Sequence, residues 1–107
     1  MLAAVLIGTI TGYDDTTGAH PFEGITTSGK RAEWGTCACS EEWEFGTVFV
    51  IEELGVFTCW DRGGLIQQKE QIDIWFPTYQ LAKVHGVWTR WAEVYREMMI
   101  PRGLREE

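Results

Sequence analysis

Asp61-Arg62-Gly63-Gly64, followed by Ile72-Asp73-Ile74-Trp75-Phe76, is the most informative stretch of this 107-residue chain. The glycine pair indicates a turn, and the second segment has the β-branched and aromatic composition of a strand. Asp61 stands just before the turn, whereas Asp73 stands inside the apolar strand. An ionised side chain is costly to bury, so a carboxylate in such a strand indicates a structural or catalytic purpose.

Short strands are expected on both sides of this stretch, separated by glycine-containing or polar turns. Their expected ranges are Leu2–Tyr13, Ile25–Lys30, Trp34–Ser40, Gly46–Glu52, Val56–Trp60, Ile72–Phe76 and Val87–Tyr95. The fourth and fifth of these pair as a hairpin through Glu53-Leu54-Gly55. Six or seven short strands with one short helix predict an all-β fold, a small β-barrel.

One helix is expected over Thr78–His85. Thr78 can cap its first turn, and Gly86 can end it in a left-handed conformation. Leu81 and Val84 stand three residues apart, which places both on one apolar face. Residues 97–107 show no period and are expected to form a tail after a single barrel domain of residues 1–96.

Composition excludes several classes of partner. A net charge of −7 opposes phosphate backbones, so no nucleic-acid partner is expected. No run approaches the roughly 20 apolar residues of a membrane-spanning helix. Residues 1–8 are apolar but lack a basic segment and a cleavage site, so we expect them to open the first strand and the chain to carry no export signal of its own.

The order of these pieces resembles the three-aspartate domain of bacterial and phage cell-wall enzymes. The matching pieces are Gly46-Thr47 before a hairpin, an Asp-x-Gly-Gly-x-Ile segment from Asp61 to Ile66, Ile72–Phe76, a short helix, and Gly86-Val87. That domain is a six-stranded double-psi β-barrel, shared with the catalytic barrel of membrane-bound lytic transglycosylase A and, more distantly, with rare lipoprotein A and expansins. The resemblance covers roughly residues 9–95 and implies the same fold here.

The resemblance implies a lytic transglycosylase whose partner is the glycan strand of peptidoglycan. The family's second and third aspartates fall on Asp61 and Asp73, and the third is the catalytic acid. A family segment that borders the sugar groove, Thr-Ala-Ser-Gly, is similar to the stretch ending at Gly29 and implies substrate contacts by Thr27 and Ser28. The remaining candidate substrate-binding residues lie near the two aspartates or beside the groove: Tyr13, Arg62, Gly63 and Trp75.

Asp73 is the expected general acid and base. Its apolar neighbours should raise its pKa, and the nearby acid Asp61 should raise that pKa further. A carboxyl that stays protonated near neutral pH can donate to a leaving glycosidic oxygen. A transglycosylase acid then takes a proton from the sugar's own 6-hydroxyl, which closes an anhydro ring without water. Four roles for Asp61 remain open: orienting Asp73, binding sugar, capping the turn, and serving as the second carboxylate of a hydrolase.

Three cysteines allow one internal disulfide and leave one thiol. Cys39 occupies the place of the family's first aspartate, and the resemblance implies that some phage-like members have cysteines at the positions of Cys39 and Cys59. These two cysteines flank the predicted hairpin, so we expect a bridge between them that joins adjacent strands near the groove. Cys37 alternates with Cys39 along a strand and is expected to be a buried apolar residue. A zinc site that combines the cysteines with His85 lacks the usual ligand spacing, and no cysteine-nucleophile motif is present, so no metal or cofactor is expected.

Six tryptophans are many for this length, and flat rings suit sugar faces. The candidate stacking rings are Trp34, Trp43, Trp60 and Trp75. Two other functions remain open: a non-catalytic glycan-binding module, and a structural part of a phage particle or secretion machine. Cys39 in place of the first aspartate favours these two. Retention of Asp61 and Asp73 favours an enzyme that acts at the cell wall within a phage or cell-wall assembly.

Overall fold

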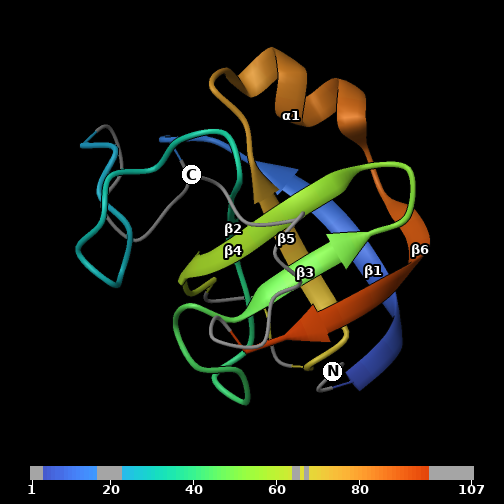
Figure 1. The fold of residues 1–107 in the computed structure, drawn as a ribbon. Helices are drawn as coiled ribbons and strands as arrows, with labels where there is room; N and C mark the ends of the chain where they lie inside the picture. Colours follow the sequence, from blue (N-terminus) through green and yellow to red (C-terminus); the bar gives the residue numbers. More distant parts are fainter. Residues whose placement is uncertain (1–3, 17–22, 64–65, 67, 97–107) are drawn as a thin grey trace.

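Six of the seven predicted strands close into a barrel in the computed structural model of the chain (Figure 1). The structure describes residues 4–16, 23–63, 66 and 68–96, so the predicted tail of residues 97–107 lies outside the described residues. Its elements are β1 (Ala4–Tyr13), β2 (Thr36–Ala38), β3 (Val48–Ile51), β4 (Gly55–Asp61), β5 (Gln71–Trp75), α1 (Tyr79–His85) and β6 (Trp88–Tyr95). The strand order β1-β5-β2-β4-β3-β6 confirms a closed six-stranded barrel with one short helix, whereas the double-psi topology stays a prediction.

Parallel and antiparallel pairing are mixed around the barrel. β1 runs parallel to β5, and β2 runs parallel to β4, whereas the other four strand pairs are antiparallel. β3 and β4 form the predicted hairpin, in whose turn Glu53 and Gly55 take φ values of 66° and 121°. A positive φ is strained for most side chains, so glycine at one of these two positions makes the turn easier to form.

Alternation along the strands separates the core from an outer face. Ile10 of β1 and both Ile72 and Ile74 of β5 are fully buried members of the core. Because successive side chains point to opposite faces of a strand, Thr11 and Asp73 lie on the outer face. Burying one such apolar side chain contributes about 1.5–3 kcal/mol, so the core strongly fixes which face carries the polar residues.

The predicted strand over Ile25–Lys30 is wrong. A single bridge between Ile25 and Arg31 is present, and the segment between them is a turn. The amide of Thr26 donates to the Lys30 carbonyl at 2.8 Å, and the amide of Gly29 donates back to the Thr26 carbonyl at 2.9 Å. Small polar residues and a glycine at φ 92° favour this turn over an extended strand. Residues 23–35 extend to one side of the barrel as a loop (Figure 1).

Helix α1 falls inside the predicted range, but its predicted apolar face is not buried. Leu81 and Val84 are 49% and 85% exposed, and Ala82 is the buried residue of the helix. A side chain at Gly12 of β1 would come within 3.2 Å of the Ala82 carbonyl, so the bare glycine allows α1 to approach the barrel through its smallest residue. Within the described part of the chain, no helix is long and apolar enough to cross a bilayer.

The helix cap gives a first testable prediction. The Oγ1 atom of Thr78 accepts from the amide of Leu81 at 3.2 Å, as the sequence predicts. We expect Thr78→Ala to lower the free energy of unfolding by about 0.5–1 kcal/mol, because one amide of the first turn loses its acceptor. Urea unfolding measures the change, and Thr78→Ser, which keeps the acceptor, is the control. Equal stability of both variants would show that the cap contributes nothing.

Candidate functional site

The two predicted carboxylates lie on one row of residues that crosses four strands. In this row Thr11 of β1 is registered with Asp73 of β5, and Asp73 is registered with Ala38 of β2. Ala38 is registered in turn with Asp61 of β4, because β4 carries one extra residue at Trp60 where the register shifts. The smallest chiral side chain, that of Ala38, therefore separates the two carboxylates. The sequence motif predicted both aspartates but not the alanine between them.

Asp73 is half-buried and has one described side-chain donor. The Oγ1 atom of Thr11 donates to its Oδ1 atom at 3.0 Å. Burial raises the pKa of Asp73 to about 6, the Thr11 hydrogen bond works against this rise, and the charge of Asp61 adds to it. The direction agrees with the prediction from the apolar strand. A group with this pKa can both hold and release a proton near neutral pH.

Asp61 is almost fully buried and surrounded by donors. Its Oδ2 atom accepts from the phenol of Tyr13 at 2.7 Å. Its Oδ1 atom accepts from the amide and the Oγ1 of Thr27, at 2.9 and 2.8 Å, and from the amide of Arg62 at 2.9 Å. These four hydrogen bonds from the protein hold the Asp61 side chain in one orientation. Asp61 therefore ties the 23–35 loop to the barrel through Thr27.

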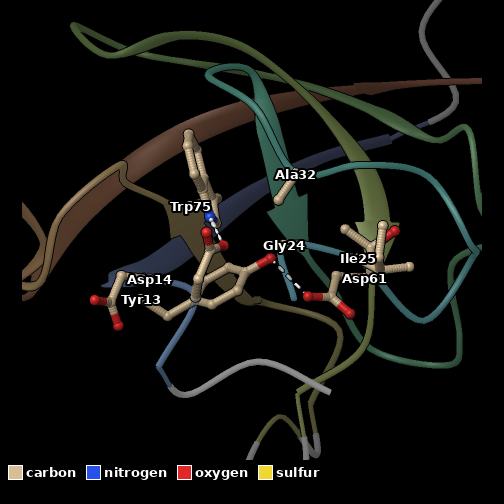
Figure 2. Close-up of a pocket in the computed structure, with 9 residues that line it drawn as sticks. Tyr13, Asp14, Gly24, Ile25, Ala32, Asp61 and Trp75 are labelled. Carbon is tan, nitrogen blue, oxygen red and sulfur yellow. Dashed lines mark hydrogen bonds between the residues drawn. The ribbon is translucent and has the colours of Figure 1, made fainter. Parts of the chain in front are cut away.

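Tyr13, the last residue of β1, donates a hydrogen bond to Asp61 at the end of β4. Burial, followed by the charge of Asp61 and the hydrogen bond to it, raises the pKa of the Tyr13 phenol well above its ordinary value. The phenol consequently stays protonated and acts as a donor. Figure 2 shows its oxygen directed at the Asp61 carboxylate.

A small pocket lies between the loop and the barrel beside this pair (Figure 2). Its lining comes from the barrel at Tyr13, Asp61 and Trp75, from the start of the loop at Asp14 and Asp15, and from the loop at Gly24, Ile25, Thr26 and Ala32. The indole nitrogen of Trp75 donates to Oδ1 of Asp15 at 2.7 Å. Asp73 does not line this pocket, so its carboxyl and the pocket are neighbouring parts of one outer face rather than one cavity.

Arg62 contributes to the site through its backbone. Its guanidinium points elsewhere and donates to the carbonyls of Ser40 and Trp43, at 3.2 and 2.7 Å. The same guanidinium lies 4.1 Å from the ring centre of Phe45. The side chain therefore holds the loop after β2, and its amide serves Asp61.

The remaining predicted residues are also structural in their contacts. The amide of Ser28 donates to the Trp60 carbonyl at 3.1 Å, and its hydroxyl lies 2.9 Å from that of Thr26. A β-carbon at Gly63 would lie 2.8 Å from Cδ1 of Ile66, so this position accepts only glycine without movement. Both residues support the loop and turn around Asp61.

The predicted disulfide is confirmed. Cys39 and Cys59 are bonded, with their Cα atoms 5.9 Å apart, and Cys37 is a buried free thiol. The bridge joins the chain just after β2 to β4, next to Ala38 and Asp61. It therefore fixes the strand ends that carry the site.

Sequence reasoning missed Thr11 and Asp15, which bond Asp73 and Trp75. Thr11 stands two residues before Tyr13, so period-two alternation already placed both on one face. Its partner depended on the parallel register of β1 with β5, which joins residues 62 positions apart. Asp15 belongs to a loop, where no periodic signal exists.

The raised pKa of Asp73 has a consequence for stability. The pKa of Asp73 is about 6 in the folded protein and 3.8 ordinarily, so folding favours the protonated carboxyl. The resulting contribution of Asp73 to the free energy of unfolding is fully present below about pH 4 and is lost as pH rises through 6. We expect Asp73→Asn to be more stable than the wild type at pH 8, by roughly 1–3 kcal/mol, and to lose this advantage near pH 4. Urea unfolding at both values measures it. An advantage that does not depend on pH would contradict the raised pKa.

Comparisons with known proteins give no independent assignment. A scan against protein-family models and a search of curated proteins both found no match to this chain. Among the described residues, no three His, Cys, Asp or Glu side chains gather in a way that could hold a metal ion.

Proposed function

We propose that this chain cleaves the glycan strand of peptidoglycan as a lytic transglycosylase, with Asp73 as general acid and base. One observation carries the proposal: Asp73 is a half-buried carboxyl on the outer face, with a pKa of about 6 and a second carboxylate across Ala38. Strongly shifted acids of this kind are concentrated at functional sites. The resemblance of the surrounding motif to three-aspartate domains supports the same assignment.

The proposed reaction needs one group that first gives and then takes a proton. Protonated Asp73 donates to the glycosidic oxygen as its bond to the anomeric carbon breaks, which leaves Asp73 ionised. The 6-hydroxyl of the same sugar then attacks the anomeric carbon, and Asp73 takes the hydroxyl proton. The product is a 1,6-anhydro sugar, and the acid is restored for the next cycle.

In this proposal Asp61 is a positioning residue. All four of its described hydrogen bonds connect it to the protein, which favours a role in holding the loop and in raising the pKa of Asp73.

The mixed parallel and antiparallel pairing of the closed barrel supports a double-psi fold. The expected setting is the cell wall, within a phage or cell-wall assembly.

A non-catalytic glycan-binding module is the second candidate. It is favoured by the 2% exposure of Asp61 and by a pocket that does not include Asp73. In this alternative, the buried carboxylate of Asp61 stabilises the loop, and the chain binds the glycan without cleaving it. Cys39 of the disulfide, which stands in the place of the family's first aspartate, also favours this candidate.

Purified sacculi separate these candidates. The protein is incubated with sacculi, and the soluble products are analysed by mass spectrometry. Anhydro-muropeptides are the result that the proposal expects. Products with reducing ends would show that the chain is a hydrolase and not a transglycosylase. Sacculus binding without soluble products would show that it is a binding module and not an enzyme.

A further inference from the structure

Asp73 lies between two strands that offer different side chains to its carboxyl. β5 is flanked by β1 on one side and by β2 on the other. The register partner on β1 is Thr11, whose Oγ1 atom donates to Oδ1 of Asp73 at 3.0 Å. The register partner on β2 is Ala38, which has no polar side-chain atom and packs with Tyr13 and Trp75. Of the two partners, only Thr11 can therefore donate from its side chain to the carboxyl.

Two further donors lie on the same outer face, two residues along each strand, but both are directed elsewhere. The phenol of Tyr13 donates to Asp61, and the indole nitrogen of Trp75 donates to the loop after β1. Within the described part of the chain, Thr11 is therefore the one side chain that hydrogen-bonds this carboxyl. The contact joins residues 62 positions apart, so the barrel itself brings the hydroxyl to the acid.

A donor at one oxygen decides where a carboxylic acid carries its proton. A protonated carboxyl has one oxygen that donates and one that accepts. Because the Thr11 hydroxyl donates to Oδ1, that oxygen is the acceptor and the proton lies on Oδ2. After the proton has left, Oδ1 keeps the same donor and Oδ2 is again the oxygen that receives a proton. The side chain of Asp73 therefore does not need to rotate between giving and taking a proton.

We propose that Thr11 is a positioning residue for Asp73, which holds Oδ1 and leaves Oδ2 to protonate the glycosidic oxygen and to deprotonate the 6-hydroxyl. This inference rests on the proposed function. Thr11 does not contact the reacting atoms; it acts through the carboxyl that it orients. Its hydrogen bond also favours the ionised carboxylate, and this lowers the pKa of Asp73 against the effect of burial.

The surrounding titratable groups leave the titration of Asp73 readable. Asp61 of β4 raises the pKa of Asp73. Burial, with a smaller contribution from the charge of Asp73, raises the pKa of both the Tyr13 phenol and the Cys37 thiol well above their ordinary values. These two groups therefore stay protonated near neutral pH, and a proton lost from this part of the site comes from a carboxyl.

NMR titration of the carboxyl carbons tests the hydrogen bond without any substrate. The spectra are recorded across about pH 3–9, and Asp73→Asn identifies the signal of Asp73. Thr11→Val keeps the size and branching of the side chain but removes the hydroxyl. We expect Thr11→Val to raise the pKa of Asp73 from about 6 to roughly 7, because the ionised form loses its donor. Thr11→Ser, which keeps the hydroxyl, should leave this pKa unchanged.

Cleavage of sacculi over the same pH range tests the positioning role. In Thr11→Val we expect a maximal rate about tenfold lower, since the acid is no longer oriented, and a fall with rising pH that begins about one pH unit higher. Thr11→Ser should restore the wild-type rate and profile. Thr9→Val is the matched control, because Thr9 is an exposed residue of the same face of β1 and is registered with Gln71 instead. Thermal melting shows that each variant is folded.

The contrary outcomes separate this inference from the proposed function. An unchanged pKa of Asp73 in Thr11→Val, or a Thr11→Ser variant that behaves like Thr11→Val, would overturn the positioning role while wild-type cleavage stands. Thr11→Val with the wild-type rate and pH profile would overturn it too, even if the pKa rises. A wild-type chain that releases nothing from sacculi would overturn the proposed function, and the catalytic purpose of Thr11 with it.

Discussion

Asp73→Asn is expected to slow glycan-strand cleavage by at least about a hundredfold, the usual scale for removing a positioned acid. Asparagine keeps the size of the side chain and can still accept the hydrogen bond from Thr11, but it cannot donate and recover a proton. Release of anhydro-muropeptides from sacculi measures the loss. Because Asp73 has a pKa of about 6 and must begin the reaction protonated, the wild-type rate should fall as pH rises above 6.

Two variants control this experiment. Glu52→Gln removes an exposed carboxylate from the β3–β4 turn and should leave cleavage unchanged. Asp61→Asn should lower the rate less than Asp73→Asn if Asp61 only holds the loop and raises the pKa of Asp73. An Asp73→Asn protein that releases anhydro-muropeptides at the wild-type rate would remove Asp73 from the mechanism and leave the binding module as the better reading.

Local patterns in the sequence were sufficient to predict the barrel. The hairpin through Glu53-Leu54-Gly55 and the apolar strand around Asp73 both depend on neighbouring residues, and both are confirmed. The cap at Thr78 is local as well and is also confirmed. The bridge from Cys39 to Cys59 was predicted from the positions of the two cysteines on either side of the hairpin, and the structure contains it.

Features that depend on distant pairing or on loop packing were harder to predict. The two apolar residues Leu81 and Val84 have helical spacing, but α1 is short and meets the barrel at Ala82, so their spacing does not mark a buried face. Arg62 stands beside a predicted acid, yet carbonyls of a loop about 20 residues earlier in the chain capture its guanidinium. Tertiary hydrogen bonds of this kind leave no periodic signal in the sequence.

Loss of the Cys39–Cys59 disulfide is expected to be the largest single change in stability. The bridge closes a sequence separation of 20 residues. Cross-linking a loop of this length restricts the unfolded chain and stabilises the fold by about 3 kcal/mol in the chain-entropy model. The double variant Cys39→Ala/Cys59→Ala should therefore lose about that much free energy of unfolding in urea. Cleavage should fall too, because the bridge fixes the ends of β2 and β4 beside Ala38 and Asp61.

Cys37 allows the disulfide to be separated from the general effect of a core cysteine. Cys37→Ala removes a fully buried sulfur that belongs to no bridge, and it should cost only about 1 kcal/mol. The wild type unfolded without a reducing agent should show one reactive thiol, from Cys37, and three after reduction. If the double variant were no less stable than Cys37→Ala, the bridge would contribute little. The stability of the site would then rest on the Arg62 contacts to the loop after β2 and on the hydrogen bonds that Asp61 accepts.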